Sequence, residues 1–173
     1  NSWARKLGLS RKTGRWRDLN IGFSSKQLQL ITGSMLGDGC LEKIRSGGSN
    51  SRFSETHGIK QSGWLKWKIS CLDPILSHYK ESLVTARKNL GGGKIVDDPT
   101  RKYQQCQMRT IKHPLFTSLE LQWYARDNDK NYILNNRGQR VKCLPINLKI
   151  SPFIMAVWFM DDGNARASRK GIH

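Results

Sequence analysis

The sequence predicts an α+β protein in which helices alternate with antiparallel hairpins, and three observations support this fold class. Helix and hairpin patterns follow one another along residues 25–123, an apolar segment that stops at Asp-Gly occurs twice, and basic residues are spread over the whole chain. A chain of 173 residues can bury one substantial core, or two small ones packed together, without disulfides or metal ions for stability.

The first expected element is a helix over residues 25–36. Ser24 and Gln27 have the spacing of a capping box, and apolar residues then recur at helical intervals. Glycines on both sides of Asp38 permit the left-handed turn that closes a helix. The helix is therefore expected to end immediately before this aspartate.

A hairpin and a second helix are expected next. Residues 40–46 and 51–60 predict two strands separated by a turn rich in glycine, serine and asparagine. Residues 62–79 have the apolar distribution of a partly buried helix, and Pro74 implies a kink or a break in it.

The following segments predict a second hairpin and a third helix. We expect strands at residues 91–98 and 102–111, with Asp98-Pro99 in the turn between them. Pro114 suits the first turn of a helix that continues to about residue 123.

A second helix that stops at Asp-Gly follows the irregular stretch 125–150. Ser151-Pro152 is a favourable helix start, and the apolar run continues to the end of MAVWFMDDG, residues 155–163. This segment parallels ITGSMLGDG, residues 31–39. The chain thus makes the same kind of helix end twice.

The repeated segment predicts a metal site. Gly33 and Gly37 lie on one helix face, where small residues let another backbone approach, and Ala156 is the corresponding small residue in the second copy. Two such helices packed side by side bring Asp38 and Asp162 together at their carboxyl ends, where the helix dipoles and mutual repulsion disfavour negative charge. Mg²⁺ or another divalent cation offsets this, and it binds carboxylates, waters and phosphate oxygens.

Charge indicates a nucleic-acid partner. Lys and Arg number 30 against 13 Asp and Glu, which gives a net charge of +17. Such a surface attracts a polyanion, although charge alone does not separate DNA from RNA. The widely spaced cysteines predict free thiols in a reducing compartment, no apolar stretch is long enough to span a membrane, and residues 1–22 predict a basic arm.

The two motifs resemble those of the LAGLIDADG homing endonucleases that carry two motif copies per chain, and the similarity is greatest to the branch found in introns of organelle and bacterial genomes. The segments 52–68, 109–114 and 144–163 are also similar to that branch. The resemblance covers most of residues 23–170 and implies a site-specific endonuclease that hydrolyses double-stranded DNA at a long recognition site with a divalent metal ion. It favours a mitochondrial or chloroplast location.

The resemblance also implies an organisation of the chain. Residues 23–124 correspond to a first αββαββα half whose antiparallel strands form a saddle for the DNA major groove. Residues 125–150 connect it to residues 151–173, which start a second half that is truncated after its motif helix. A second polypeptide or a further C-terminal segment would complete that half.

On this resemblance Asp38 and Asp162 hold the metal ions, and Lys60, with Gln61 as the alternate, lies near the metal-bound water. His57 is expected to have a structural or surface role, and Asp161 is expected at most to support Asp162. Polar strand residues are the candidates for nucleic-acid contacts, because a two-stranded ribbon fits the major groove. Together with Lys60 and Gln61 they are Lys43, Arg45, Arg52, Lys94, Lys102, Gln104 and Arg109.

Two other functions remain open at this stage. Some members of the same family act as intron maturases or RNA-binding factors, and dispersed positive charge suits a folded RNA. A non-catalytic DNA-binding protein would keep the strands and lose the metal ions. The retention of Asp at both motif positions favours the nuclease.

Overall fold

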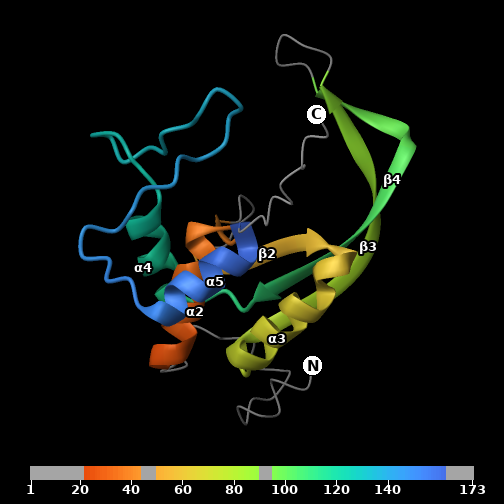
Figure 1. The fold of residues 1–173 in the computed structure, drawn as a ribbon. Helices are drawn as coiled ribbons and strands as arrows, with labels where there is room; N and C mark the ends of the chain where they lie inside the picture. The colour runs from red at the N-terminus through yellow and green to blue at the C-terminus, as the bar shows by residue number, and fades with distance from the viewer. Residues whose placement is uncertain (1–21, 44–49, 90–94, 163–173) are drawn as a thin grey trace, which may run out of the picture.

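The computed structural model describes residues 22–43, 50–89 and 95–162 (Figure 1). Predictions for Arg45, Lys94, most of the basic arm and the end of the second motif lie outside these residues. The described part consists of one antiparallel sheet with helices against it, followed by a long irregular connector and a last helix.

The sheet has four strands in the order β1-β2-β4-β3, and every neighbouring pair is antiparallel. Figure 1 shows that β3 and β4 form a long curved hairpin that extends well beyond the helices. The strands are β1 (Cys40–Lys43), β2 (Ser51–Gly58), β3 (Leu76–Asn89) and β4 (Ile95–Thr110).

The helices confirm the expected order of elements. The first of them begins after a complete capping box, in which Ser24 and Gln27 exchange hydrogen bonds. The helical elements are α2 (Ser25–Leu36), the 3₁₀ turn η2 (Ile59–Gln61), α3 (Ser62–Leu72), α4 (Pro114–Trp123) and α5 (Pro152–Asp162).

One hydrophobic core lies between the helices and one face of the sheet. Phe53 of β2 and Met108 of β4 are fully buried, and they belong to the same cluster as Met35 of α2, Leu65 of α3 and Phe116 of α4. The alternation of side chains along a strand therefore leaves the opposite face of the sheet free for other contacts.

The second hairpin differs from the sequence prediction. The helix α3 ends at Leu72, and the chain enters β3 at Leu76, where the sequence predicts continued helix. The predicted turn at Asp98-Pro99 lies inside β4, because the register moves from Thr85↔Lys102 to Ala86↔Asp98 and accommodates the proline as an irregularity. The hairpin is therefore formed by residues 76–89 with 95–110.

The helix α5 packs side by side with α2 (Figure 1). A Cβ atom on Gly33 would lie 2.7 Å from the Val157 Cβ atom, and one on Gly37 would lie 2.7 Å from the Asp161 Cβ atom. The prediction that both glycines permit close packing is confirmed, but the expected role of Ala156 is wrong, because Ala156 is exposed and Val157 fills the contact.

The outer side of α5 is apolar and exposed. Met155, Phe159 and Met160 are each more than half exposed, at 56%, 67% and 51%. No described helix is long and apolar enough to cross a membrane. All four cysteines are free thiols, as their spacing predicts.

Candidate functional site

The two motif acids lie at the same ends of two packed helices. Asp38 follows the last turn of α2, where the amide groups of Gly37 and Gly39 both donate to the Ser34 carbonyl oxygen. Asp162 is the last residue of α5. Because α2 and α5 pack through Gly33, both carboxylates belong to one region of the surface.

Asp38 is partly exposed to solvent, and its pKa is influenced by neighbouring charges. Its side chain is 45% exposed, and its Oδ2 atom lies 3.4 Å from Nδ1 of His57. Partial burial raises the pKa of Asp38, the His57 ring opposes this, and the Asp162 carboxylate raises it further. The influence of Asp162 on this pKa means that the two carboxylates interact.

Lys142 is the lysine that the structure places at the end of α2. Its Nζ atom donates to the carbonyl oxygens of Met35 and Gly37, at 2.8 Å each. Burial lowers the pKa of Lys142, whereas nearby groups that include Asp162 and Asp38 raise it. An ammonium in this position satisfies carbonyl groups that a helix end leaves free and complements the helix dipole.

The connector between Tyr124 and Ser151 holds Lys142 in place. Isolated bridges pair Tyr124 with Lys142 and Leu134 with Arg140, so the connector folds back on itself. Arg140 donates to the Leu41 carbonyl oxygen and pairs with the buried carboxylate of Glu120 at 3.3 Å. These contacts fix the connector against β1 and α4 and bring Lys142 to the motif.

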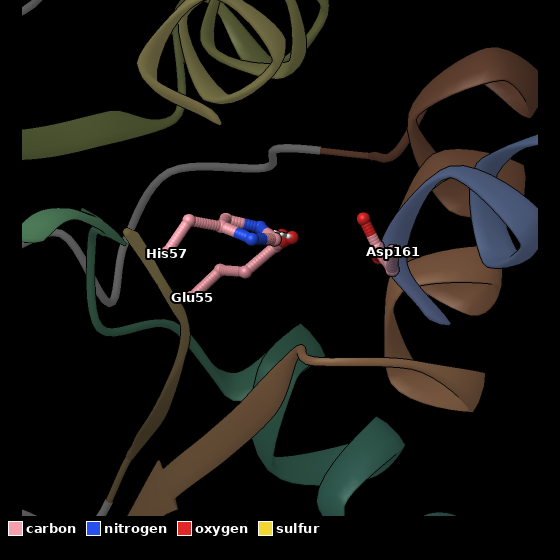
Figure 2. A group of neighbouring side chains, drawn as sticks. All are labelled: Glu55, His57 and Asp161. Carbon is pink, nitrogen blue, oxygen red and sulfur yellow. Dashed lines mark hydrogen bonds and ion pairs between the residues drawn. The ribbon is translucent and has the colours of Figure 1, made fainter. Parts of the chain in front are cut away.

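A buried polar cluster lies directly beneath the motif acids. Figure 2 shows Glu55 and His57 of β2 pointing toward Asp161 of α5. Ligand atoms of these three side chains lie within 4.8 Å of one another, which is a spacing that a metal ion could bridge. In this structure, however, the ammonium of Lys68 contacts both Glu55 and Asp161.

The ammonium of Lys68 therefore already supplies a cation to this cluster. The pKa of Glu55 is lowered although burial acts to raise it, because His57 and Lys68 both bond to the carboxylate. Burial acts to lower the pKa of His57, yet the 2.6 Å contact between its Nε2 atom and Glu55 prevails, and the pKa is raised. The cluster is better described as an internal ion network than as a metal site.

Asp38 and Asp162 fit a divalent metal ion better than the buried cluster does. Both acids are solvent-accessible oxygen donors, and neither forms an ion pair with a lysine or arginine among the described residues. The Asp162 carboxylate accepts one hydrogen bond, from Nε1 of Trp158 at 3.2 Å. Two adjacent carboxylates that accept water and metal are the donor set that Mg²⁺ favours.

Other predicted site residues lie on β1 and on the η2 turn. Lys60 and Gln61 are exposed in the η2 turn at the end of β2. Lys43 is exposed at the end of β1. Their assignment to the metal-bound water or to nucleic acid stays a prediction.

The predicted strand contacts are divided between two faces of β4. Lys102 and Gln104 share their side of the strand with buried Cys106, whereas Arg109 lies on the opposite side by alternation. A shallow groove on the outer part of the hairpin is lined by residues that include Arg101, Tyr103, Gln105 and Arg87. Three of these lie on the same side of β4 as Arg109.

Two residues predicted to contact nucleic acid, Arg52 and Arg109, approach the same carboxylate, Glu42. Arg52 of β2 bonds to the Glu42 carboxylate with Nε at 2.7 Å and Nη2 at 2.6 Å, and Arg109 of β4 approaches the same oxygen at 3.8 Å. The outward face of the sheet therefore presents two arginine side chains that are held by a carboxylate.

Sequence reasoning missed the residues that support the site. Lys68 looks like an ordinary helix residue, and Lys142 lies in a stretch without periodic pattern. A signal for Lys68 exists in the sequence, since it falls on the apolar side of α3 in line with Leu65 and Leu72. Glu55 and His57 fall at every second position after Phe53, so they lie on the same face of β2 as this buried residue, which likewise indicates that they are buried.

Comparison with known proteins identifies the family to which this chain belongs. Residues 28–173 match the model of the LAGLIDADG DNA endonuclease family. The homing endonuclease I-WcaI bound to its DNA recognition sequence has a similar structure, with a TM-score of 0.60 and 18% identity over 98% of this chain and 66% of that one. This likeness shows the fold.

Curated relatives extend the comparison. The chain is 30% identical to the protein RecA of Mycolicibacterium chitae over 149 residues, 86% of this chain and 28% of that protein. It is also 30% identical to the cytochrome b mRNA maturase bI2 of Saccharomyces cerevisiae over 148 residues, 83% of this chain and 31% of that protein. The chain thus spans about a third or less of these relatives.

The chain belongs to the LAGLIDADG DNA endonuclease family. The predicted family and fold class are confirmed.

Proposed function

We propose that this protein is a metal-dependent endonuclease that cuts double-stranded DNA at a long, specific site. The observation that carries the proposal is the meeting of Asp38 and Asp162 at the ends of two helices packed at Gly33, beside the ammonium of Lys142. Two carboxylates close enough to interact electrostatically are less stable in their charged forms unless a cation or a proton is present.

In this proposal Asp38 and Asp162 hold the metal ions. A divalent ion held by Asp38 and Asp162 would activate water and stabilise the leaving oxygen of a phosphodiester. Lys142 lies close enough to interact with both acids, and its ammonium is available to a phosphate oxygen or to the water near them. The predicted alternatives for this position, Lys60 and Gln61, are exposed on η2.

The outward face of the sheet is the proposed DNA surface. Arg52, Arg109 and the groove residues Arg101 and Gln105 lie there, and a curved antiparallel ribbon fits the major groove. The net charge of +17 supports binding to any nucleic acid at low salt. Affinity therefore has to be compared at several salt concentrations.

The test is cleavage of a pool of long randomised duplexes in the presence of Mg²⁺, followed by sequencing of the broken ends. We expect breaks at one related set of sites, and a loss of at least about 1000-fold in rate for Asp38→Asn and for Asp162→Asn. Both variants should still bind the selected duplex. An intact, folded protein that breaks no duplex at any site contradicts the proposal.

A second candidate is supported by the relationship to the maturase bI2. In that case the protein holds a folded intron RNA, and the outward face of the sheet contacts phosphates and 2′-hydroxyl groups. Tight, salt-resistant binding to intron RNA without DNA cleavage would favour this function. Binding of a specific duplex without cleavage would instead favour a non-catalytic DNA-binding protein.

A further polypeptide segment is proposed to complete the protein around α5. The exposed apolar side chains of Met155, Phe159 and Met160 support this proposal, since a packed partner would remove them from water. A mitochondrial or chloroplast location also remains a proposal, with the family relationship to a maturase as its support.

A further inference from the structure

We propose that Lys68 is a positioning residue that fixes the carboxyl end of α5, and with it Asp162, against the end of α2. The inference deepens the proposed function, because it rests on Asp38 and Asp162 forming one metal site. It concerns a residue that makes no contact with either of these acids.

The ammonium of Lys68 joins three elements besides its own helix. Its Nζ atom donates to Ser34 Oγ of α2 at 2.8 Å and to Asp161 Oδ1 and Oδ2 of α5 at 2.6 and 2.8 Å. It also pairs with Glu55 of β2. Since Lys68 belongs to α3, a single charged group links α2, α3, α5 and the sheet.

These groups are sealed from water. The side chains of Lys68, Glu55 and Asp161 are all 0% exposed in their ion pairs. The Trp64 ring covers the ammonium at 4.9 Å from its centroid, and Nε1 of Trp64 donates to Asp161 at 2.7 Å. A buried ion pair that loses one partner leaves an uncompensated charge in the interior, which is strongly unfavourable.

The cost of breaking the buried ion pair between Lys68 and Asp161 holds α5 in position. If the end of α5 moves away, Asp161 leaves the ammonium, and Lys68 keeps only Glu55 and Ser34 as hydrogen-bond partners. Asp162 is the next residue on the same helix, so its place relative to Asp38 depends on this contact. Gly37 sets the distance, because Asp161 occupies the space that a side chain at residue 37 would fill.

The same network also reaches the first motif acid. Glu55 contacts both Lys68 and Nε2 of His57, and Nδ1 of His57 lies 3.4 Å from Asp38. A series of contacts thus runs from Asp161 through Lys68, Glu55 and His57 to Asp38. Lys68 is the one member that contacts both β2 and α5 directly.

The test compares Lys68→Met with Lys66→Met. Methionine has a similar length and removes the charge, and Lys66 is an exposed lysine of the same helix whose ion pair with Glu81 lies at the surface. Hydrogen–deuterium exchange is measured for backbone amides of residues 155–162 and for those of β2 and β4. We expect Lys68→Met to accelerate exchange in residues 155–162 by about tenfold or more, with β2 and β4 much less affected.

The second measurement is metal dependence on the selected duplex. We expect Lys68→Met to raise the half-saturating Mn²⁺ concentration for cleavage by about tenfold or more, while the affinity for DNA in Ca²⁺ stays within about twofold of the parent. Lys66→Met should change neither the Mn²⁺ concentration nor the exchange of α5. Equal acceleration of exchange over the whole chain, or an unchanged Mn²⁺ dependence in a folded variant, overturns the proposal.

Asp161→Asn keeps the test decisive if Lys68→Met does not fold. The amide oxygen of asparagine still accepts from Lys68 and Trp64, so the packing is retained while the charge is removed. We expect the same local effect on residues 155–162, and combining the two substitutions should add little to either one. Additive effects contradict action through Asp161.

The two proposals fail in different ways. If the parent protein cuts no DNA, the proposed function fails, and the exchange measurement still decides whether Lys68 holds α5. If the parent protein cuts DNA and Lys68→Met leaves both exchange and Mn²⁺ dependence unchanged, the proposed function stands and the positioning role of Lys68 is lost.

Discussion

At the scale of single residues, the arrangement of charge around the motif acids is uneven. Inside the protein, Lys68 pairs with both Glu55 and Asp161, and His57 also contacts Glu55, while Lys142 bonds to carbonyl oxygens at the end of α2. Asp38 and Asp162 are left at the surface without a lysine or arginine partner among the described residues. The acids without a lysine or arginine partner are therefore those that solvent, and a metal ion, can reach.

The buried carboxylate of Glu55 gives a prediction for pH dependence. Burial acts to raise the pKa of Glu55, but the bonds from His57 and Lys68 lower it below its ordinary value of 4.5. Its contribution to stability is thus present above the unfolded pKa and is lost as the pH falls through the lower folded pKa. We expect the stability difference between the parent and Glu55→Gln to shrink toward acid pH, measured by urea unfolding between about pH 3 and pH 6. A difference that does not change over this range contradicts the ion network.

Lys142 gives a prediction that separates two of its effects. Lys142→Met removes the donor to Met35 and Gly37, so we expect a loss of about 0.3–1 kcal/mol in the free energy of unfolding. If Lys142 also assists the reaction, cleavage should fall by about 100-fold or more. Lys149→Met, which changes an exposed lysine of the same connector, is the control for both measurements. Equal effects of the two substitutions would place Lys142 outside the reaction.

At the scale of elements, the sequence predicts helices better than the long strands. The capping box before α2 and the proline at the start of α4 are local signals, and the structure contains both. The sequence predicts helix at residues 76–79 because their apolar spacing suits either structure, and β3 forms there because its residues pair with β4 over the length of the hairpin. A short window of sequence does not reveal which distant residues will pair in a sheet.

The sequence indicates only some of the residues around the candidate site. Asp38 and Asp162 follow from a repeated pattern, and the structure brings them to one region. Lys68 and Lys142 come from segments of α3 and the connector that lie far from the motifs in the sequence, and only the fold places them there. Position by position, the two motifs align Gly33 with Val157, and the structure places Val157 in the contact while Ala156 is exposed, so small size alone does not identify the residue that faces Gly33.

The contact between α2 and α5 gives a prediction for Gly33. A Cβ atom at this position would lie 2.7 Å from the Val157 Cβ atom and 2.8 Å from the Ile154 carbonyl oxygen. We expect Gly33→Ala to cost about 1–3 kcal/mol of stability, because neither neighbour can move without shifting α5. Gly63→Ala is the matched control, since nothing lies within 4 Å of a Cβ atom there. Equal unfolding midpoints in urea for the two variants would show that α5 is loosely held.

At the scale of the whole molecule, the two faces of the sheet carry different groups. One face carries the core and the ion network, and the other carries Arg52, Arg109 and the groove along the β3–β4 hairpin. The β3–β4 hairpin extends beyond the helices (Figure 1). If nucleic acid binds this face, as proposed, the arginine and lysine side chains on it set how the affinity responds to salt.

This division predicts which lysines and arginines govern nucleic-acid affinity. We expect Arg101→Ala to weaken binding and to reduce the slope of log K against log salt by about 0.9 if the arginine contacts one phosphate of a duplex. Lys26→Ala, which removes an exposed charge from the first turn of α2, should leave the slope unchanged. The measurement is fluorescence anisotropy with a labelled duplex over a series of salt concentrations. A slope that responds equally to both substitutions would place the binding surface elsewhere.

The ion pair between Lys68 and Asp161 has a consequence for protein engineering. Chimeric proteins made by exchanging motif helices between relatives would inherit α5 from one parent and α3 from the other. A donor helix with an apolar residue at position 161 would leave Lys68 with a missing partner, and a bulky residue opposite Gly33 would prevent docking. Exchange of these parts therefore requires that Lys68, Asp161 and the residues facing Gly33 be transferred as one set.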